Sequence, residues 1–291
     1  MPLDVDFGTD AQRHRYFVVD VFTDTALAGN QLGVFADARS FATEDMQRLA
    51  RELNLAETVF ILPPTQDGDV RIRIFTPATE LPFAGHPVLG TAFVVGSALG
   101  SDAVRLETGL GIVPIALERA AGRIVFGRMD QPVPSWHRYE RATELLAALG
   151  LQGSGLPVEA YRNGPLHVYV ELEDGEAIAA LRPDLAAIDA LGHVGVNCFA
   201  GSGRHWKTRM FAPGLGVTED PATGSAAGPL ALHLARHGRV RFGDEIEIRQ
   251  GLEIARPSVL YARVDGSAAG VERVQVGGSA VIIARGEFRL G

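Results

Sequence analysis

Cysteine is almost absent from this chain, because Cys198 is the only one in 291 residues. A single thiol excludes an intrachain disulfide framework and any metal site built from several cysteines. Cys198 itself lies in the apolar run VGVNCFA, which favours a buried packing residue over a nucleophile.

Long hydrophobic runs are absent as well. No stretch approaches the ~18 consecutive apolar residues of a membrane span. The acidic start MPLDVDFGTD has no apolar signal core. We therefore expect a soluble cytoplasmic protein with no membrane partner.

Clusters of positive charge are missing too. The chain has 27 Lys and Arg against 35 Asp and Glu, a formal net charge of −8, and its basic residues are scattered. Because binding to phosphates needs clustered Lys and Arg, nucleic acid is excluded as a partner.

Motifs for cofactors and metals are also lacking. The glycines form neither a G-x-G-x-x-G turn after a strand nor a P-loop, so nothing supports a nucleotide cofactor. His233 and His237 are four residues apart on a predicted helix, but no third ligand lies near them in the sequence. His167, His193 and His205 fit no metal-ligand spacing either. We expect no cofactor and no metal.

The chain does have enough apolar material for a large core, with 46% hydrophobic residues and a mean hydropathy of +0.10. Strand-like and helix-like segments follow one another in two similar rounds. We predict a loose N-terminal arm at residues 1–14, a first half at 15–130 and a second half at 131–291. The last strand, about residues 280–291, is a candidate to return to the first half.

Two segments share a spaced pattern of Arg, Phe, Pro, Glu, Pro and Gly. The first carries it at Arg73, Phe75, Pro77, Glu80, Pro82 and Gly85, and the second at Arg209, Phe211, Pro213, Glu219, Pro221 and Gly224. The offset grows from 136 residues (209 − 73) to 139 (224 − 85), so about three residues are inserted in the second loop. The pattern favours two similar halves over coincidence, although a duplication without a shared site stays open.

Each repeat ends in a helix that begins at a glycine. The first N–H groups of a helix are unpaired and carry roughly half a positive charge, so a helix start attracts anions. Glycine lets a ligand approach the backbone, and Ser225 adds a hydroxyl group. Two such starts across a cleft, at Gly85 and Gly224, predict a small anionic substrate for which these residues clear space.

A reaction also needs a proton carrier, and three residues are candidates. Glu57 stands where a helix gives way to an apolar strand, as either a salt-bridged structural acid or a desolvated base with a raised pKa. His86 lies at the first helix start, where it either caps the helix or takes part in the chemistry. Asp220 precedes the second helix, where an Asp is most often an N-cap.

Four stretches carry a resemblance to a known family. They are FVVDVFTDTALAGNQLGVF, NLAETVF, RIFTPATELPFAGHPVLGTA and RMFAPGLGVTEDPATGSAAG. The chain resembles the PhzF-like proteins of phenazine biosynthesis, which have the diaminopimelate epimerase-like fold. The resemblance implies an α+β fold of two pseudo-symmetric domains, each a curved β-sheet or barrel wrapped around a central helix, with the active site between them.

The resemblance also implies a function. The best-known relative isomerises trans-2,3-dihydro-3-hydroxyanthranilate, needs no cofactor or metal, and forms homodimers. By motif match, Glu57 would be the general acid/base, and His86 and Asp220 would contact the polar groups of the substrate. Substrate binding at the helix starts is implied for Gly85, Gly224 and Ser225.

The sequence departs from relatives at two places. Diaminopimelate epimerase and proline racemase use two thiols, one at each helix start, and this chain has Ala84 and Asp220 near those positions, so a two-thiol racemase is excluded. Ala56 stands before Glu57 where relatives often carry Ser, which leaves the exact substrate open. Two alternatives to a cofactor-independent isomerase stay open, namely a non-catalytic small-molecule or protein-binding member of the fold and a one-base epimerase of an amino acid.

Overall fold

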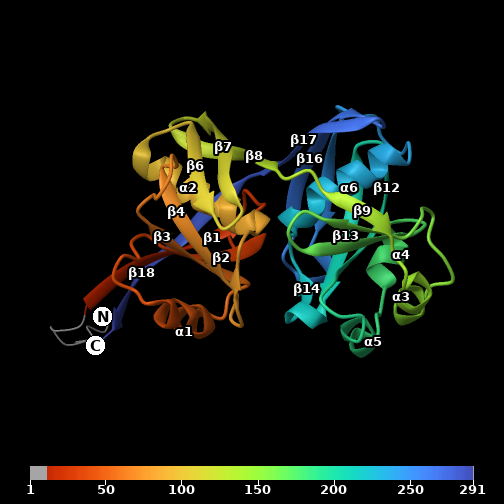
Figure 1. Cartoon of the computed structure of the whole chain (residues 1–291), viewed down its shortest axis with the longest axis horizontal. Helices are drawn as coiled ribbons and strands as arrows, with labels where there is room; N and C mark the ends of the chain where they lie inside the picture. Colours follow the sequence, from red (N-terminus) through yellow and green to blue (C-terminus); the bar gives the residue numbers. More distant parts are fainter. Residues whose placement is uncertain (1–11, 291) are drawn as a thin grey trace.

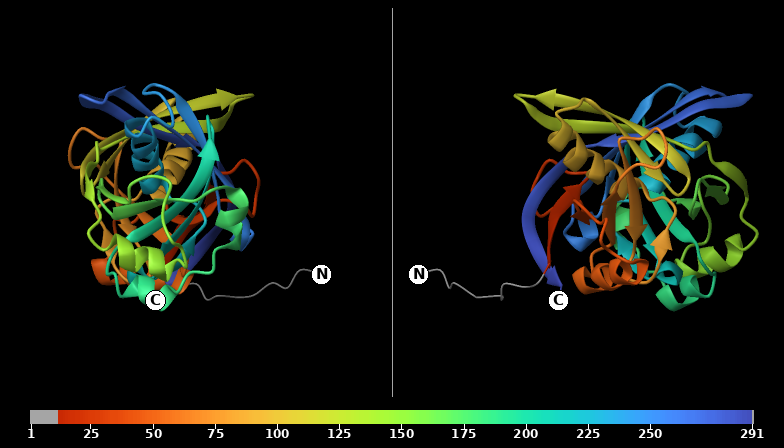
Figure 2. Two further views of the ribbon diagram at one scale, coloured as in Figure 1. Left: turned by 90° about the vertical axis from the view of Figure 1, so that its right-hand side faces the viewer. Right: turned by 60° about the vertical axis from the view of Figure 1, so that its left-hand side comes forward.

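A computed structural model describes residues 12–290 of the chain, which form two halves lying side by side (Figure 1). In each half a curved sheet wraps around one helix, α2 (Gly85–Leu99) in the first and α6 (Gly224–Arg236) in the second (Figure 2). The predicted α+β fold of two similar domains is therefore confirmed.

The first half holds the strands that precede residue 132, together with the last strand of the chain. Its strands are β1 (Gln12–Val21), β2 (Asn30–Phe35), β3 (Glu57–Leu62), β4 (Val70–Phe75), β5 (Glu80–Leu81), β6 (Ala103–Thr108), β7 (Gly111–Ala120), β8 (Arg123–Gln131) and β18 (Ala280–Leu290). Besides α2 it contains α1 (Thr43–Leu53).

The second half repeats this order with more short helical segments. Its strands are β9 (Ser135–Arg138), β10 (Glu159–Arg162), β11 (Leu166–Glu171), β12 (Gly195–Ser202), β13 (His205–Ala212), β14 (Val217–Asp220), β15 (Glu245–Gln250), β16 (Ser258–Ser267) and β17 (Gly270–Gly278). The helical segments besides α6 are α3 (Ala142–Ala148), α4 (Gly175–Ala180), α5 (Leu185–Asp189) and the 3₁₀ turns η1 (Pro213–Leu215) and η2 (Leu252–Ile254).

Helices α2 and α6 lie at the centre of their halves because they are apolar on all sides. Every residue from Gly85 to Gly96 is buried, and so is every residue from Gly224 to Ala235. A helix of this composition has no face suited to water and must be enclosed by the sheet. Among residues 12–290, no helix is long and apolar enough to cross a membrane.

The internal repeat corresponds to one strand-loop-helix unit built twice. Arg73 pairs with Glu80 at 2.6 Å, and Arg209 pairs with Glu219 at 2.8 Å. Each guanidinium also lies over the phenylalanine two residues further along, 5.1 Å from the ring centre in the first half and 4.9 Å in the second. The repeated Arg, Phe and Glu therefore brace equivalent loops.

One strand joins the sheets of the halves by hydrogen bonds, and another returns along the chain from the second half to the first. β8 pairs with β7 in the first half and with β17 in the second. β18 pairs antiparallel with β1 from Gln12–Leu290 to Val21–Ala280, so the last strand lies in the sheet of the first half.

The pairing of β18 with β1 also corrects the predicted N-terminal arm of residues 1–14. Residues 1–11 lie outside the described residues, but Gln12, Arg13 and His14 belong to β1. Their polar sequence resembles a loop, and their partner strand is about 270 residues away in the chain (287 − 15 = 272 for the pair Arg15–Glu287). Local sequence gives no sign of such a distant partner.

Candidate active site

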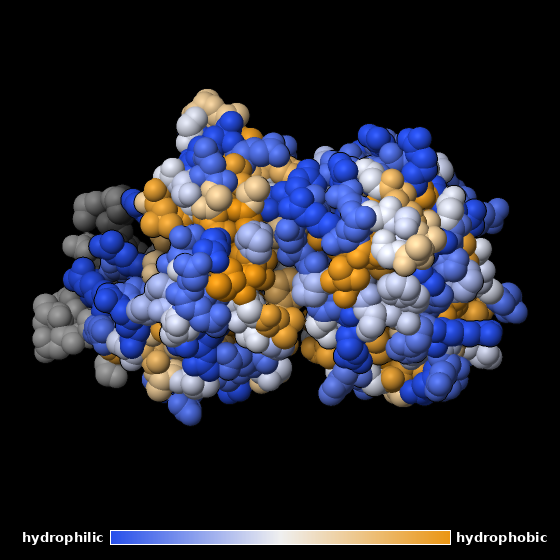
Figure 3. Space-filling view, turned by 45° about the horizontal axis from the view of Figure 1, so that its top comes forward, coloured by the Kyte–Doolittle hydropathy of each residue, from blue (hydrophilic) through white to orange (hydrophobic). Residues whose placement is uncertain are grey.

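A cleft of about 480 Å³ lies between the two halves, where the starts of α2 and α6 face each other. This volume falls in the range of small-molecule sites. Its apolar walls include Ala56, Leu81, Pro82, Phe83, Leu110, Pro165, Leu166, Met210, Leu215 and Val217. Apolar side chains also reach the surface beside the boundary of the halves (Figure 3).

The two helix starts pack directly against each other. A Cβ added to Gly85 would lie 2.8 Å from the carbonyl carbon of Gly224 and 2.8 Å from the amide nitrogen of Ser225. A Cβ on Gly224 would lie 3.0 Å from the ring of Phe22. We expected these glycines to clear space for a ligand, but the contact between the helices by itself requires glycine at both positions. It also brings the two positive helix ends to one place.

Glu57 and His86 face each other at the first helix start. Glu57 is the first residue of β3, and its Oε2 lies 3.2 Å from His86 Nε2. Both atoms are buried and make no regular hydrogen bond with the described residues. Within that part of the chain no Lys or Arg pairs with Glu57, which argues against a structural salt bridge. His86 is the second residue of α2 and its side chain does not cap the helix.

Burial sets the protonation of this pair. Burial is the larger cause and the negative charge of Asp220 the smaller one, and together they raise the pKa of Glu57 to about 8. Burial also lowers the pKa of His86 to about 3. Glu57 therefore carries a proton at neutral pH and His86 is uncharged. A carboxyl group with a pKa near the pH of the cell is suited to both giving and taking a proton.

Asp220 stands at the end of β14 and serves as an acceptor, not as the N-cap that sequence statistics favour. It accepts hydrogen bonds from Asn30 Nδ2 at 2.8 Å and from Thr223 Oγ1 at 2.5 Å. The N-cap of α6 is Thr223. Burial raises the pKa of Asp220 to about 6, although the two hydrogen bonds act in the opposite direction. Asp220 thus remains mostly ionised at neutral pH.

Asn30 links the two halves at the site, and sequence reasoning missed it. Besides Asp220, its Nδ2 contacts the carbonyl oxygen of Ala222 at 2.9 Å and lies 3.3 Å from His86 Nδ1. Asn30 is the first residue of β2 and is fully enclosed. A polar residue at the start of an apolar strand is the one signal that could have singled it out.

The second helix start has its own histidine, which sequence analysis noted only as unsuited to metal binding. His167 on β11 is buried, and its Nε2 lies 3.0 Å from Ser225 Oγ. Burial lowers the pKa of His167 to about 4, so the ring is uncharged at neutral pH. Gly85, Gly224 and Ser225, predicted to bind the substrate, all line the cleft.

Two further groups lie away from the cleft. Cys198 is fully buried and burial raises its pKa to about 12, which confirms a packing role. His233 and His237 do have an acidic neighbour, Glu159, that the sequence could not reveal. Arg236 already donates to the same Glu159 oxygen at 2.7 Å, so a cationic side chain satisfies this carboxylate. The arrangement is that of a partly buried polar network.

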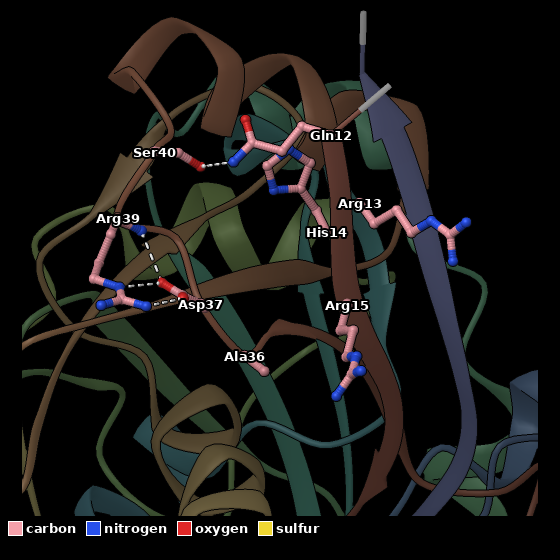
Figure 4. A pocket seen from close by; sticks show the side chains of 8 residues that line it. All are labelled: Gln12, Arg13, His14, Arg15, Ala36, Asp37, Arg39 and Ser40. Atoms are coloured by element: carbon pink, nitrogen blue, oxygen red, sulfur yellow. Dashed lines mark hydrogen bonds and ion pairs between the residues drawn. The ribbon is translucent and has the colours of Figure 1, made fainter. Parts of the chain in front are cut away.

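A second hollow of about 660 Å³ lies beside the start of β1 (Figure 4). Its walls carry charged side chains, but Arg39 is paired with Asp37 at 2.6 Å and both are largely exposed. Arg13 and Arg15 each lie 3.9 Å from Glu287. Solvated ion pairs contribute little and are common on protein surfaces. The cleft between the halves holds a buried acid beside a buried imidazole, with no Lys or Arg among residues 12–290 paired with that acid, and is the better candidate for an active site.

Comparison with known proteins agrees with this geometry. Residues 19–286 match the family described as phenazine biosynthesis-like protein. The chain is 55% identical to trans-2,3-dihydro-3-hydroxyanthranilate isomerase of Pseudomonas aeruginosa, over 95% of this chain and 100% of that one. It is 51% identical to the enzyme of the same name from Pseudomonas chlororaphis, with the same coverage.

A solved structure supports the fold independently. A predicted epimerase from Pseudomonas aeruginosa superposes with a TM-score of 0.81 at 34% identity, over 94% of this chain and 99% of that one. Two similar halves, a buried acid between them and a match over nearly the whole length thus lead to one conclusion. The chain belongs to the phenazine biosynthesis-like family, of which the PhzF isomerases are members.

Proposed function

We propose that this protein isomerises trans-2,3-dihydro-3-hydroxyanthranilate by proton transfer. The observation that carries the proposal is Glu57, a buried carboxyl group with a pKa of about 8 that lines the cleft and has no cationic partner among the described residues. Relatives more than 50% identical over nearly the full chain bear the name of this activity.

The name of the substrate defines where its double bonds lie before the reaction. The ring is a 2-aminobenzoate with hydrogens added at C2 and C3 and a hydroxyl on C3, which leaves double bonds at C1–C6 and C4–C5. Removing the proton from C3 and adding one at C1 moves the double bonds to C3–C4 and C5–C6. The enol formed at C3 then becomes a ketone. No electrons enter or leave, so a residue that moves a proton is sufficient for the chemistry.

Glu57 is the residue that would move this proton from C3 to C1. As a carboxylate it would take the proton from C3, and as a carboxylic acid it would return it at C1. A positioned acid/base of this kind contributes about 10²–10⁴ in rate. His86 Nε2 lies 3.2 Å from the same carboxyl group, so this uncharged ring is placed to share a hydrogen bond with Glu57 between the two steps.

The rest of the cleft suits the other groups of such a substrate. The convergent starts of α2 and α6, at Gly85 and Gly224, favour a carboxylate. Asp220 is a carboxylate that suits the substrate's amino group. Ser225 adds a hydroxyl group beside the second helix start. Holding the substrate in one orientation between them would let one acid reach both carbons.

Assembly and location are proposals of the same kind. We propose that the protein acts as a homodimer in the cytoplasm, as the family resemblance implies. Light scattering coupled to gel filtration, at micromolar protein concentration, gives the mass directly. A mass near 31.0 kDa would be that of one chain and would contradict the dimer.

The function is tested with purified protein and trans-2,3-dihydro-3-hydroxyanthranilate in D₂O, followed by NMR. We expect product with deuterium incorporated at carbon, and no detectable product with Glu57→Gln. Absence of turnover by the unmodified protein would refute the substrate, and turnover by Glu57→Gln would refute the assigned base. Ala56→Ser provides a matched variant next to Glu57 that keeps the acid, and we expect it to remain active.

A further inference from the structure

Ser225 is held on both its side chain and its backbone by residues outside its own helix. His167 Nε2 lies 3.0 Å from the hydroxyl oxygen. Asn163 Nδ2 donates to the Ser225 carbonyl at 3.1 Å. That carbonyl is available because the residue four positions on is Pro229, which has no N–H to continue the helix. The helix continues through Pro229 but lacks one backbone hydrogen bond, and an outside donor takes its place at Ser225.

The hydrogen-bond network defines the tautomer of His167. Asn197 Nδ2 donates to the Gly195 carbonyl oxygen at 3.0 Å, which fixes that atom as the amide nitrogen because a carbonyl can only accept. The same nitrogen lies 3.3 Å from His167 Nδ1. Since an uncharged imidazole has one donor and one acceptor, Nδ1 accepts here and Nε2 carries the proton.

The position of that proton determines what the serine can do. His167 Nε2–H donates to Ser225 Oγ, so the hydroxyl oxygen is used as an acceptor on that side. The hydroxyl hydrogen of Ser225 must then point elsewhere, and the side chain lines the cleft. Ser225 is therefore presented as a donor toward a ligand, next to a helix start that already favours anions.

We propose that His167 is a positioning residue for the substrate carboxylate, acting through Ser225. The identity of the substrate rests on the proposed function, whereas the orientation of the serine does not. In the first half the residue after the helix-start glycine is His86, which faces the acid directly. In the second half that position is Ser225, and the imidazole comes from β11 instead.

The backbone is shaped to admit this imidazole. A Cβ on Gly195 would lie 2.7 Å from His167 Nδ1 and 3.2 Å from Cε1. Position 195 must therefore be glycine while the ring keeps this place. If His167 only filled space, another apolar side chain could replace it. The buried hydrogen-bonded series Asn197, His167 and Ser225 instead needs each of its members.

The first test reads the tautomer without any ligand. In protein labelled with ¹⁵N-histidine, the two ring nitrogens of His167 give separate signals, which His167→Gln removes and so assigns. We expect a protonated Nε2 and an unprotonated Nδ1 at neutral pH. A proton on Nδ1, or a charged ring, would overturn the inference, whether or not the protein turns over the proposed substrate.

The second test reads the effect on the substrate. His167→Leu keeps a side chain of apolar bulk but has no hydrogen-bond donor. KM should therefore rise roughly tenfold, the factor expected for one hydrogen bond to a charged group, while kcat changes little. His167→Gln, whose amide can replace the Nε2 donor, should recover most of the loss. In a Ser225→Ala background, His167→Leu should have no further effect.

The opposite results refute the positioning role. Fully additive effects of His167→Leu and Ser225→Ala would show that the histidine does not act through the serine, and so would a fall in kcat with unchanged KM. If His167→Leu does not fold, His167→Gln and the tautomer signal decide. If the unmodified protein has no activity on the proposed substrate, the proposed function fails and the tautomer alone decides this inference.

Discussion

In the first half, Leu32 on β2 lies opposite Glu57 on β3. In the second half, His167 on β11 lies opposite Gly195 on β12. The two pairs are equivalent, because Glu57 and Gly195 each lie one residue before the strand partner of the repeated phenylalanine. The first half thus has the carboxyl group of Glu57 at a position where the second half has Gly195, which has no side chain. An imidazole from the neighbouring strand occupies the space that the glycine leaves.

The difference shows which features are tied to the scaffold and which to the chemistry. The Arg–Glu pair, the stacked phenylalanine and the glycine at the helix start occur in both halves. The polar residues that face the cleft do not match, since Leu81 in the first loop corresponds to Asp220 in the second. A duplicated frame therefore encloses an asymmetric site, which suits one acid acting on a substrate held in one orientation.

The strongest test of this asymmetry removes its acid. Glu57→Gln should lower the rate by about 10²–10⁴ or more, because no equivalent carboxyl group stands in the second half. Gly195→Glu in the same background should not restore activity, since a side chain there would collide with His167. Initial rates with the proposed substrate measure both effects, and recovery by the double variant would contradict the asymmetry.

The repeated ion pairs should differ in their contribution to stability. Arg209 is buried and also donates to the carbonyl oxygens of Ile178 and Leu181, whereas Arg73 is about a quarter exposed. We expect Arg209→Met to lower the free energy of unfolding by ~3 kcal/mol and Arg73→Met by ~1 kcal/mol or less. Urea denaturation measures both, and equal losses would mean that the two braces are energetically alike.

The raised pKa of Glu57 predicts a stability that depends on pH. Below the unfolded pKa of 4.5 the group is protonated in both states and has no effect. As the pH rises from 4.5 towards about 8, the unfolded state ionises and the folded state does not, so stability is lost. Glu57→Gln should avoid this loss, on the order of a few kcal/mol. Thermal melts from pH 5 to 9 should show the melting temperature of the variant rising relative to that of the unmodified protein as the pH increases. A constant difference between the two would refute the raised pKa of Glu57.

The smallest effect concerns the charge of Asp220. If Glu57 must be a carboxylate to start the reaction, kcat/KM should rise with pH up to about 8. Asp220→Asn removes a nearby negative charge, so the rise should move to lower pH, even though activity falls as a whole. Because burial is the larger cause of the raised pKa, the displacement should be modest. A pH–rate profile that moves to higher pH would contradict the assigned coupling.

The sequence was sufficient for the fold and for the residues that we predict carry the chemistry because both are encoded in short contiguous stretches. The spaced Arg, Phe, Pro, Glu and Gly pattern lies within one strand-loop-helix unit, and helices predicted near Gly85 and from Gly224 begin there. Glu57, His86 and Asp220 stand next to these units, and the structure gathers them around one cleft.

The partners of these residues could not be predicted, because strand pairing places them. Asn30 reaches Asp220 across 190 residues of chain, and His167 reaches Ser225 across 58. Which side chains meet across a sheet is set by the register, which a single sequence does not display. The same limitation misplaced the end of the N-terminal arm at residue 14, because the partner of β1 is β18.

The position of β18 has a consequence for the order in which the protein is made. Chains emerge from the ribosome N-terminus first, and domains usually fold as they appear. Here the sheet of the first half lacks a strand until residues 280–290 have been synthesised, after all of the second half. The half that contains Glu57 is thus completed last although most of it is made first. The edge of β1 that does not pair with β2 therefore has no partner strand during nearly the whole period of translation.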